Sequence, residues 1–268
     1  MDGSCTMRMV ILFFFALTGQ AEAQELDSQF VASSATGTIV VERLSDGRRW
    51  TANPARAQQR FLPASTFKIV NSLIILETRV VNDPQADILE WDGLARGGGW
   101  DQNQNLRLAF RRSAVWAFQE WARRVGHAEM QHHVSAMEYG SGDIGSAVSI
   151  DTFWLNGPLE ISAQEQIDFL QRLHARSLPI RAGVMDAVVE VMEADRGENW
   201  VLRAKTGWAI RDTPNVGWYV GWLETEGDVY FFALNMELDY AADDGRERIE
   251  IALSALEAVT DLDLLSEH

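Results

Sequence analysis

Lysine is almost absent from this sequence of 268 residues. Lys68 and Lys205 are the only two, and arginine supplies the rest of the 23 basic side chains. An arginine keeps its proton in proteins, whereas burial makes a lysine amine easier to deprotonate. Retention of lysine at only two positions therefore suggests that both sites need an amine that can become neutral.

Cysteine is scarcer still, since Cys5 is the only one. It precedes the apolar run of an N-terminal signal, so the mature chain is expected to contain no thiol, disulfide or cysteine-based metal site. The histidines form no H-x-H-x-D pattern, and no metal site is expected from them either. They are His127, His132, His133, His174 and His268.

Long apolar runs are confined to the N-terminus. Arg8 precedes an apolar stretch at residues 9–17, and Ala21-Glu22-Ala23 follows. This pattern predicts a secretory signal peptide over residues 1–23, cleaved after Ala23. No later stretch approaches the roughly 20 apolar residues of a membrane helix. The mature protein is expected to be secreted into the periplasm and to have no membrane association.

Acidic residues outnumber basic ones by 39 to 23, which gives a formal net charge of −16 at pH 7. Loss of residues 1–23 would leave a net charge of −15. Such a charge disfavours binding to nucleic acid or to an anionic membrane. An anionic substrate would therefore need a local cationic pocket.

Strand patterns occur at both ends of the chain, with helical patterns between them. Predicted strands cover residues 36–43, 48–52, 200–206, 216–224 and 229–236. The first two form a hairpin, and a helix over 246–258 follows the last. Residues 83–195 alternate helical patterns with loops, and Gly97-Gly98-Gly99 is interpreted as a turn. The sequence thus predicts an α+β fold, with an antiparallel sheet from both chain ends flanked by helices and a helical middle subdomain at about 83–195.

Both lysines lie in short motifs of serine acyl-transfer enzymes. Ser65-Thr66-Phe67-Lys68 is an S-x-x-K and Lys205-Thr206-Gly207 is a K-T-G, in the order found in penicillin-interacting enzymes. With this composition, chance gives the first motif about 0.12 times and the second about 0.007 times, so the K-T-G is the stronger signal. A helical pattern over residues 65–78 predicts that Ser65 and Lys68 share one face, with backbone N–H groups near a developing oxyanion.

Further motifs in the same order resemble those of the class D serine β-lactamases, the oxacillin-hydrolysing family, over essentially the whole mature chain. They are Pro63-Ala64-Ser65-Thr66-Phe67-Lys68, Ser113-Ala114-Val115, Phe153-Trp154-Leu155-Asn156-Gly157, Arg203-Ala204-Lys205-Thr206-Gly207-Trp208, and Arg248. The resemblance implies that residues 24–268 form one domain with the serine β-lactamase and penicillin-binding transpeptidase-like fold. It also implies hydrolysis of penicillin-type antibiotics through an acyl-enzyme on Ser65.

The resemblance assigns roles to individual catalytic residues. Lys68 would react with carbon dioxide to give a carbamate, N6-carboxylysine, that acts as general base. Trp154 would donate its indole N–H to this group and Val115 would form an apolar wall beside it. Ser113 would relay a proton to the β-lactam nitrogen. Without the resemblance, Ser113 would be interpreted as the N-cap of a helix through Glu120, and Trp154 as a core aromatic residue.

Substrate binding is assigned mainly to the second lysine motif and the last helix. The expected substrate-binding residues are Val115, Lys205, Thr206, Gly207, Trp208 and Arg248. The guanidinium fork of Arg248 suits a substrate carboxylate, and Arg246 is the competing candidate two residues earlier. The backbone N–H groups of Ser65 and Trp208 would form the oxyanion hole.

One motif departs from the family pattern. Tyr139-Gly140-Ser141 stands where Y-G-N is usual, and the loop from there to Trp154 is about two residues longer than in many relatives. A serine hydroxyl does not provide the donors and acceptor of an amide. A different substrate range or loop order is therefore expected.

Two alternative functions share S-x-x-K and K-T-G. One is a β-lactam sensor that is acylated without turnover, which would be attached to membrane-spanning segments. The other is a D-Ala-D-Ala carboxypeptidase, which would lack this S-x-V and F-W-L-x-G combination. The absence of S-D-N and of a glutamate in an E-x-x-L-N context argues against a class A enzyme. The expected partner is a small-molecule β-lactam, without nucleic acid and with no cofactor besides carbon dioxide, and a homodimer is left open.

Overall fold

The computed structural model describes residues 26, 30, 35–210, 213–239, 245–260 and 262–265. The predicted signal peptide, residues 1–23, lies outside the described residues. Within the described part of the chain, no helix is long and apolar enough to cross a membrane. The possible homodimer stays a prediction.

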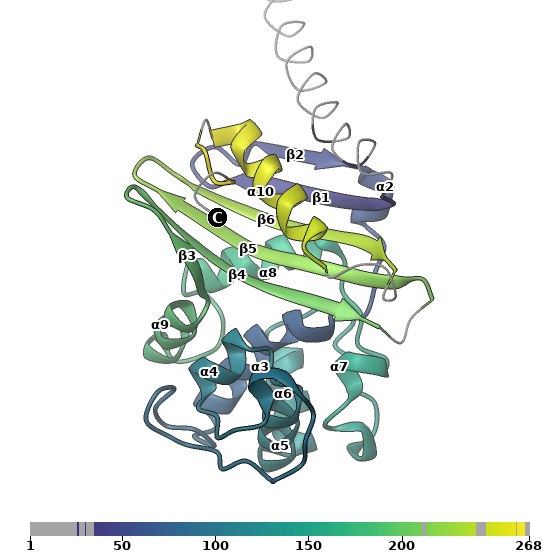
Figure 1. Cartoon of the computed structure of the whole chain (residues 1–268), viewed down its shortest axis with the longest axis vertical. Helices are drawn as coiled ribbons and strands as arrows, with labels where there is room; N and C mark the ends of the chain where they lie inside the picture. The colour runs from purple at the N-terminus through teal and green to yellow at the C-terminus, as the bar shows by residue number, and fades with distance from the viewer. Residues whose placement is uncertain are drawn as a thin grey trace, which may run out of the picture.

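A six-stranded antiparallel sheet, in the order β2-β1-β6-β5-β4-β3, spans the molecule (Figure 1). The strands are β1 (Gly37–Arg43), β2 (Arg49–Ala52), β3 (Glu193–Arg196), β4 (Trp200–Ala209), β5 (Asn215–Thr225) and β6 (Val229–Leu238). β1 from the start of the chain pairs with β6 near its end, with Gly37 opposite Met236 and Arg43 opposite Tyr230. The prediction of an antiparallel sheet built from both chain ends is confirmed.

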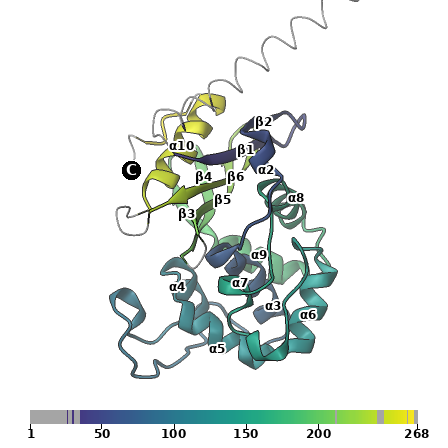
Figure 2. The same ribbon diagram turned by 90° about the vertical axis from the view of Figure 1, so that its right-hand side faces the viewer.

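Helices cover both faces of the sheet (Figure 2). α10 (Glu247–Thr260) packs on β1, β5 and β6 from one face, and α8 (Ala163–His174) packs on the same strands from the other. The remaining helices on that second side form the helical subdomain. They are α3 (Lys68–Glu77), α4 (Leu106–Arg111), α5 (Val115–Val125), α6 (His127–Ala136), α7 (Phe153–Asn156), α8 (Ala163–His174) and α9 (Ala182–Val191). The short α2 (Pro54–Ala57) follows β2, and the 3-10 helices are η1 (Ala64–Phe67), η2 (Gly98–Trp100) and η3 (Ala147–Ser149).

The alternation of side chains along the strands creates two cores. On β6, Phe232 and Leu234 belong to the core beneath α10, whereas Phe231 and Ala233 belong to the core of the helical subdomain. α3 lies inside this second core, where every residue from Lys68 to Leu76 is buried. The lysine of the S-x-x-K motif is therefore carried by the most enclosed helix of the subdomain.

Two details of the chain differ from the sequence analysis. β3 was not predicted, because Glu-Ala-Asp-Arg offers no apolar alternation and its strand geometry comes from pairing with β4 around a bulge. The helix predicted from Ser65 begins instead as the 3-10 turn η1, and regular α-helix starts at Lys68. The predicted 3.6-residue periodicity holds from Lys68 onward.

Candidate active site

Ser65 and Lys68 face each other where η1 passes into α3. Lys68 Nζ lies 2.6 Å from Ser65 Oγ, at hydrogen-bond distance. Ser65 is partly exposed, whereas Lys68 is fully buried. The preceding Ala64 adopts a left-handed backbone with φ of 47°, which is unfavourable for alanine. The predicted pairing of the two side chains is present, on a strained turn.

The surroundings of Lys68 favour its neutral form. Its Nζ lies 5.3 Å from the centroid of the Phe118 ring. Burial, together with the nearby charge of Lys205, holds the pKa of Lys68 well below its ordinary value. A neutral amine has a free lone pair, so this lysine is able to accept a proton or to attack an electrophile.

Trp154 lies in α7, beside the same turn. Its indole stacks on the Phe67 ring at 5.5 Å with an interplanar angle of 25°, and it meets the Phe153 ring edge-on. Among the described residues, the fully buried Nε1 of Trp154 has no hydrogen-bond partner. Gly157 follows α7, and glycine is needed at this position because a Cβ there would lie 2.5 Å from Phe153 Cα. The interpretation of Trp154 as a core aromatic residue accounts for its packing but leaves its donor unexplained.

A polar network braces the turn from behind. Gln166 Nε2 on α8 donates to Thr66 Oγ1 at 3.1 Å and to the Tyr139 hydroxyl at 3.2 Å. Thr66 Oγ1 in turn donates to Pro63 O at 2.7 Å. Gln166 was not predicted as a site residue, since a single glutamine on an amphipathic helix carries no signal of its own.

Ser141 replaces the usual asparagine of the Y-G-N motif and bonds to backbone groups. Its Oγ accepts from Glu160 N at 3.1 Å and donates to Pro158 O at 3.3 Å. Gly140 beside it has φ of 55°, and a Cβ there would lie 2.2 Å from Glu160 O. The hydroxyl thus ties the motif to the segment that follows α7.

The K-T-G segment of β4 packs directly on η1. A Cβ on Gly207 would lie 2.9 Å from Pro63 O and 3.0 Å from Thr66 Cγ2, so glycine permits this close approach. Lys205 is buried, with its Nζ 5.6 Å from the Phe110 ring centroid and 3.1 Å from Thr206 O. Burial, with the charge of Arg248 adding to it, lowers the pKa of Lys205 to about 7. The second lysine is therefore also able to lose its proton.

Ser113 lies in a tight left-handed turn between α4 and α5. Its φ is 54°, and Ala114, not Ser113, occupies the N-cap position of α5 without a side-chain cap. The interpretation of Ser113 as a helix N-cap is therefore wrong. Val115 is the first residue of α5, and both Ser113 and Val115 line the same cleft as Ser65.

Arg248 in the first turn of α10 reaches this cleft from the other side of the sheet. Its guanidinium lies 5.2 Å from the Trp208 ring centroid, and only 8% of the residue is exposed. Gly245 leaves room for it, since a Cβ there would lie 2.4 Å from Nη1. Arg246 is exposed and does not line the cleft. The geometry favours Arg248 over Arg246 as the cation of the site.

These residues surround a cleft of about 550 Å³. The sequence-predicted residues on its wall are Ser65, Ser113, Val115, Thr206, Gly207, Trp208 and Arg248. Lys68, Trp154 and Lys205 are buried outside this lining set. Trp100, Leu155 and Ile210 also line the cleft without having been predicted to do so.

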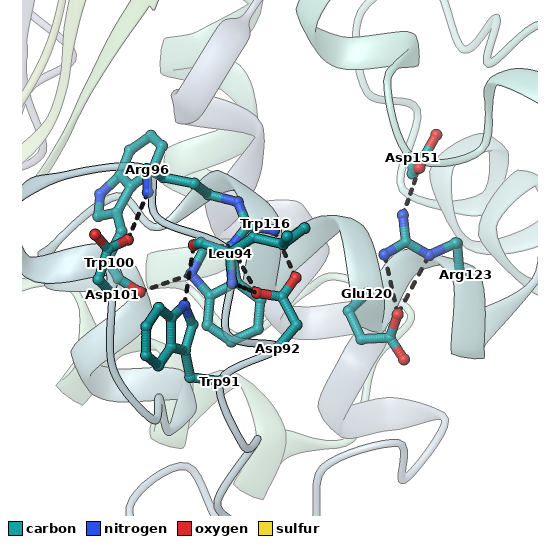
Figure 3. A network of polar contacts seen from close by, with 10 residues as sticks. All are labelled: Trp91, Asp92, Leu94, Arg96, Trp100, Asp101, Trp116, Glu120, Arg123 and Asp151. Carbon is teal, nitrogen blue, oxygen red and sulfur yellow. Dashed lines mark hydrogen bonds and ion pairs between the residues drawn. The ribbon is translucent and has the colours of Figure 1, made fainter.

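Trp100 follows the glycines interpreted as a turn, and Gly98 and Gly99 form the 3-10 turn η2 with it. Its indole Nε1 donates to Arg112 O at 2.9 Å, and its carbonyl accepts from Trp116 Nε1 at 3.0 Å. Figure 3 shows Trp100 and Trp116 close together, with Arg96 nearby. An aromatic residue next to a glycine run is too common a pattern to have identified this wall from the sequence.

The arrangement brings four groups together: a hydroxyl, a buried amine within hydrogen-bond distance of it whose neutral form is favoured by burial, a cation for an anionic group, and a strand edge beside the hydroxyl. Acyl transfer to Ser65 needs these groups together. Among the described residues, no group of histidine, cysteine and carboxylate side chains is able to hold a metal ion.

Comparisons with known proteins agree with this geometry. The model of the penicillin binding protein transpeptidase domain matches residues 18–257. The chain is 38% identical over 218 residues to the β-lactamase OXA-48 of Klebsiella pneumoniae, which covers 81% of each chain. It is also 38% identical over 250 residues to OXA-2 of Salmonella typhimurium, covering 92% of this chain and 88% of that one.

Solved structures give the same result. The class D β-lactamase YbXI from Nostoc superimposes with a TM-score of 0.85 at 44% identity, covering 87% of this chain and 98% of the other. FUS-1 (OXA-85), a class D β-lactamase from Fusobacterium nucleatum subsp. polymorphum, has a TM-score of 0.85 at 34% identity, with coverages of 90% and 99%.

Proposed function

Since the chain belongs to the class D serine β-lactamase family, we propose that it hydrolyses the β-lactam ring of penicillin-type antibiotics through an acyl-enzyme on Ser65. The observation that carries the proposal is the distance of 2.6 Å between Ser65 Oγ and the amine of a fully buried lysine, Lys68. A serine hydroxyl is a weak nucleophile, and an adjacent base activates it.

Acylation forms one bond and breaks another. Ser65 Oγ attacks the lactam carbonyl carbon and loses its proton to the base at Lys68. The ring C–N bond breaks, and the ring nitrogen takes up this proton through the Ser113 hydroxyl. The backbone N–H groups of Ser65 and Trp208 stabilise the negative charge on the carbonyl oxygen. A water molecule then attacks the ester carbon, and Ser65 leaves with its hydroxyl proton restored. The product is the ring-opened acid.

The substrate carboxylate is held at the other end of the cleft. Arg248 supplies a guanidinium that remains charged, and Thr206 supplies a hydroxyl. Lys205 lies beneath them with a pKa of about 7, so its charge varies near neutral pH. In a chain with a net charge of −16, this local cationic end is what admits an anionic substrate.

The surroundings of Lys68 fit a bound carbon dioxide. Only a neutral amine reacts with carbon dioxide, and burial favours the neutral form of Lys68. The anionic product needs a buried donor, and the Nε1 of Trp154 has no partner among the described residues. Lys68 and Trp154 would hold the group. As a carbamate on Lys68 it would supply the general base of the reaction.

Export to the periplasm accompanies this function. The N-terminal pattern of residues 1–23 supports cleavage of a signal peptide, and the targets of β-lactams lie outside the cytoplasmic membrane. The relatives are named as β-lactamases, which supports turnover over the two alternatives, a sensor and a carboxypeptidase.

A chromogenic cephalosporin and mass spectrometry test the proposal. Wild type should complete many turnovers, and Ser65→Ala should lower kcat by about 10⁵-fold with an unchanged melting temperature. Ser135→Ala, on the exposed side of α6, is the matched control and should keep full activity. A covalent adduct should map to Ser65. Stoichiometric acylation without turnover would identify a sensor instead, and an adduct on another serine would remove the nucleophile assignment.

A further inference from the structure

A second cleft, of about 500 Å³, continues from the active site along the edge of β4. The two clefts share Thr206: the active-site cleft runs from Thr206 to Ile210, and the second lies against Ala204 to Thr206. β3 pairs with β4 only up to Arg203, and Met192 O accepts from Ala204 N at 2.9 Å. Because the partner strand stops there, a ligand on the strand edge can extend from one cleft into the next. The second cleft is called the α4 cleft here, after the helix on its outer wall.

Two arginines of α4 give this cleft its charge. Arg107 and Arg111 are four residues apart, so they project from the same face of the helix, and both are exposed. Neither forms an ion pair with another described residue. Lys205 forms part of the same cleft.

The acidic residues of the cleft do not cancel this charge. Glu193 already pairs with Arg196 at 2.6 Å and lies 3.9 Å from Arg203. These two arginines, with Arg107 adding a weaker attraction, lower the pKa of Glu193. Asp195 is the remaining carboxylate on the wall. The α4 cleft therefore keeps an excess of positive charge in a protein that is acidic overall.

A third cleft, of about 530 Å³, provides a comparison, because its arginines form ion pairs with acidic side chains of the protein. There Arg96 pairs with Asp92, and Arg123 pairs with both Glu120 and Asp151 (Figure 3). The arginines Arg96 and Arg123 of this cleft are therefore neutralised by carboxylates of the protein, whereas the two arginines of α4 are available to a ligand.

We propose that the α4 cleft binds an anionic substituent of the substrate, a carboxylate or sulfonate carried on the ring carbon next to the one that bears the ring carboxylate. The inference rests on the proposed function. In the proposed complex, Trp208 of β4 lies beside the lactam carbonyl and Thr206 beside the ring carboxylate. A substituent that extends past the carboxylate would therefore lie next to Lys205 and Ala204, on the wall of the α4 cleft. In a cephalosporin that is the C3 substituent, and it enters the α4 cleft.

The test uses two cephalosporins that differ at C3 by one carboxylate group, one with an N-carboxymethyl-tetrazolylthiomethyl substituent and one with its neutral N-methyl analogue. Wild type should hydrolyse the anionic compound with a kcat/KM about 10-fold above that of the neutral one, because each arginine offers a charge-assisted hydrogen bond. Arg107→Gln/Arg111→Gln should abolish this preference and leave kcat/KM for the neutral compound within two-fold. The preference should also weaken as salt is raised.

Arg123→Gln/Arg124→Gln on α5 is the matched control, since it removes the same two charges from exposed positions outside the α4 cleft. It should keep the preference. Equal loss of the preference for the anionic compound in both double variants would assign the effect to the overall electrostatic field of the protein and overturn the proposal. Equal hydrolysis of the two compounds by wild type would overturn it and leave the β-lactamase function intact. Binding to Ser65→Ala, measured by calorimetry, should show the same 10-fold preference in Kd without any turnover.

Discussion

The two layers that flank the sheet bury different kinds of side chain. Beneath α10, Leu253 and Leu256 of the helix join a core with Phe232 and Leu234 of β6. On the opposite face, α3 buries a lysine, an asparagine and a serine within its first five residues. One layer is packed for stability, whereas the other accepts buried polar groups that stability alone does not favour.

Several of these polar groups lack partners among the described residues. Both amide atoms of Asn71, the Oε1 of Gln166 and the Nε1 of Trp154 are buried in this way on the helical side. An unsatisfied buried polar atom destabilises a fold by about 1–3 kcal/mol. Groups that persist at such a cost indicate a layer that is not arranged for stability alone.

The largest expected effect comes from making the helical layer resemble the α10 layer. Lys68→Met keeps the length of the side chain and removes the amine. Turnover should fall by about 100- to 10,000-fold, the usual contribution of a general base, and added bicarbonate should not restore it. Stability should rise, because a desolvated amine is replaced by an apolar side chain. Steady-state hydrolysis and urea unfolding measure the two effects, and a less stable variant would show that the amine is well satisfied in the fold.

The same lysine makes both activity and stability depend on pH. The pKa of Lys68 in the folded protein lies below 10.5, its ordinary value in an unfolded chain. At a pH between the folded and the unfolded pKa, the unfolded chain therefore binds more protons than the folded protein. The free energy of unfolding should therefore rise with pH in this window, and Lys205 adds the same trend from about pH 7 upward. Lys68→Met should flatten the curve. Wild-type activity should fall at acidic pH and recover partly with bicarbonate, and bicarbonate-independent turnover there would oppose a carbamate.

The contrast between the layers also explains what the sequence was able to predict. The strands and α10 follow from alternating or periodic apolar residues, which reflect the need to bury one face. The S-x-x-K spacing predicted the contact of Ser65 with Lys68 because i and i+3 residues of a helix are neighbours. The left-handed turn at Ser113 and the wall formed by Trp100 depend instead on contacts between segments, and local pattern does not encode those. The same holds for β3, which exists only through pairing with β4.

Arg248 is where the α10 layer reaches the active-site cleft, and its removal should separate the packing of that helix from its proposed part in substrate binding. Arg248→Ala should raise KM for substrates with the ring carboxylate by about 10- to 150-fold, the equivalent of about 1.5–3 kcal/mol for a charge-assisted hydrogen bond. Arg246→Ala, exposed two residues earlier, should do little. The penalty should shrink as salt screens the acidic field of the protein. A larger effect on KM from Arg246 would transfer the carboxylate role to that residue.

A smaller effect is expected from removing one unsatisfied donor of the helical layer. Trp154→Phe keeps an aromatic ring against Phe67 and loses the indole N–H. Deacylation should slow by about 10-fold, the value of one hydrogen bond, and acylation should change less. The time course should show a burst followed by slow turnover that bicarbonate partly rescues. Trp218→Phe, which loses a donor bonded to Leu62 O at 2.9 Å, is the control and should lower stability without any bicarbonate dependence. Equal slowing of both steps without rescue would make Trp154 a packing residue.

The smallest effect on turnover is expected from the apolar layer itself. Leu256→Ala opens a cavity beneath α10 and should destabilise the fold by about 2–5 kcal/mol, yet kcat measured well below the melting temperature should stay within two-fold. Leu73→Ala makes the same truncation in α3, the helix that begins with Lys68, and both side chains are fully buried. It should lower stability by a similar amount and also reduce kcat, because the cavity loosens the helix that positions the amine. Equal losses of kcat in both variants would mean that the two layers move as one body, and the division between a stabilising face and a reactive face would not hold.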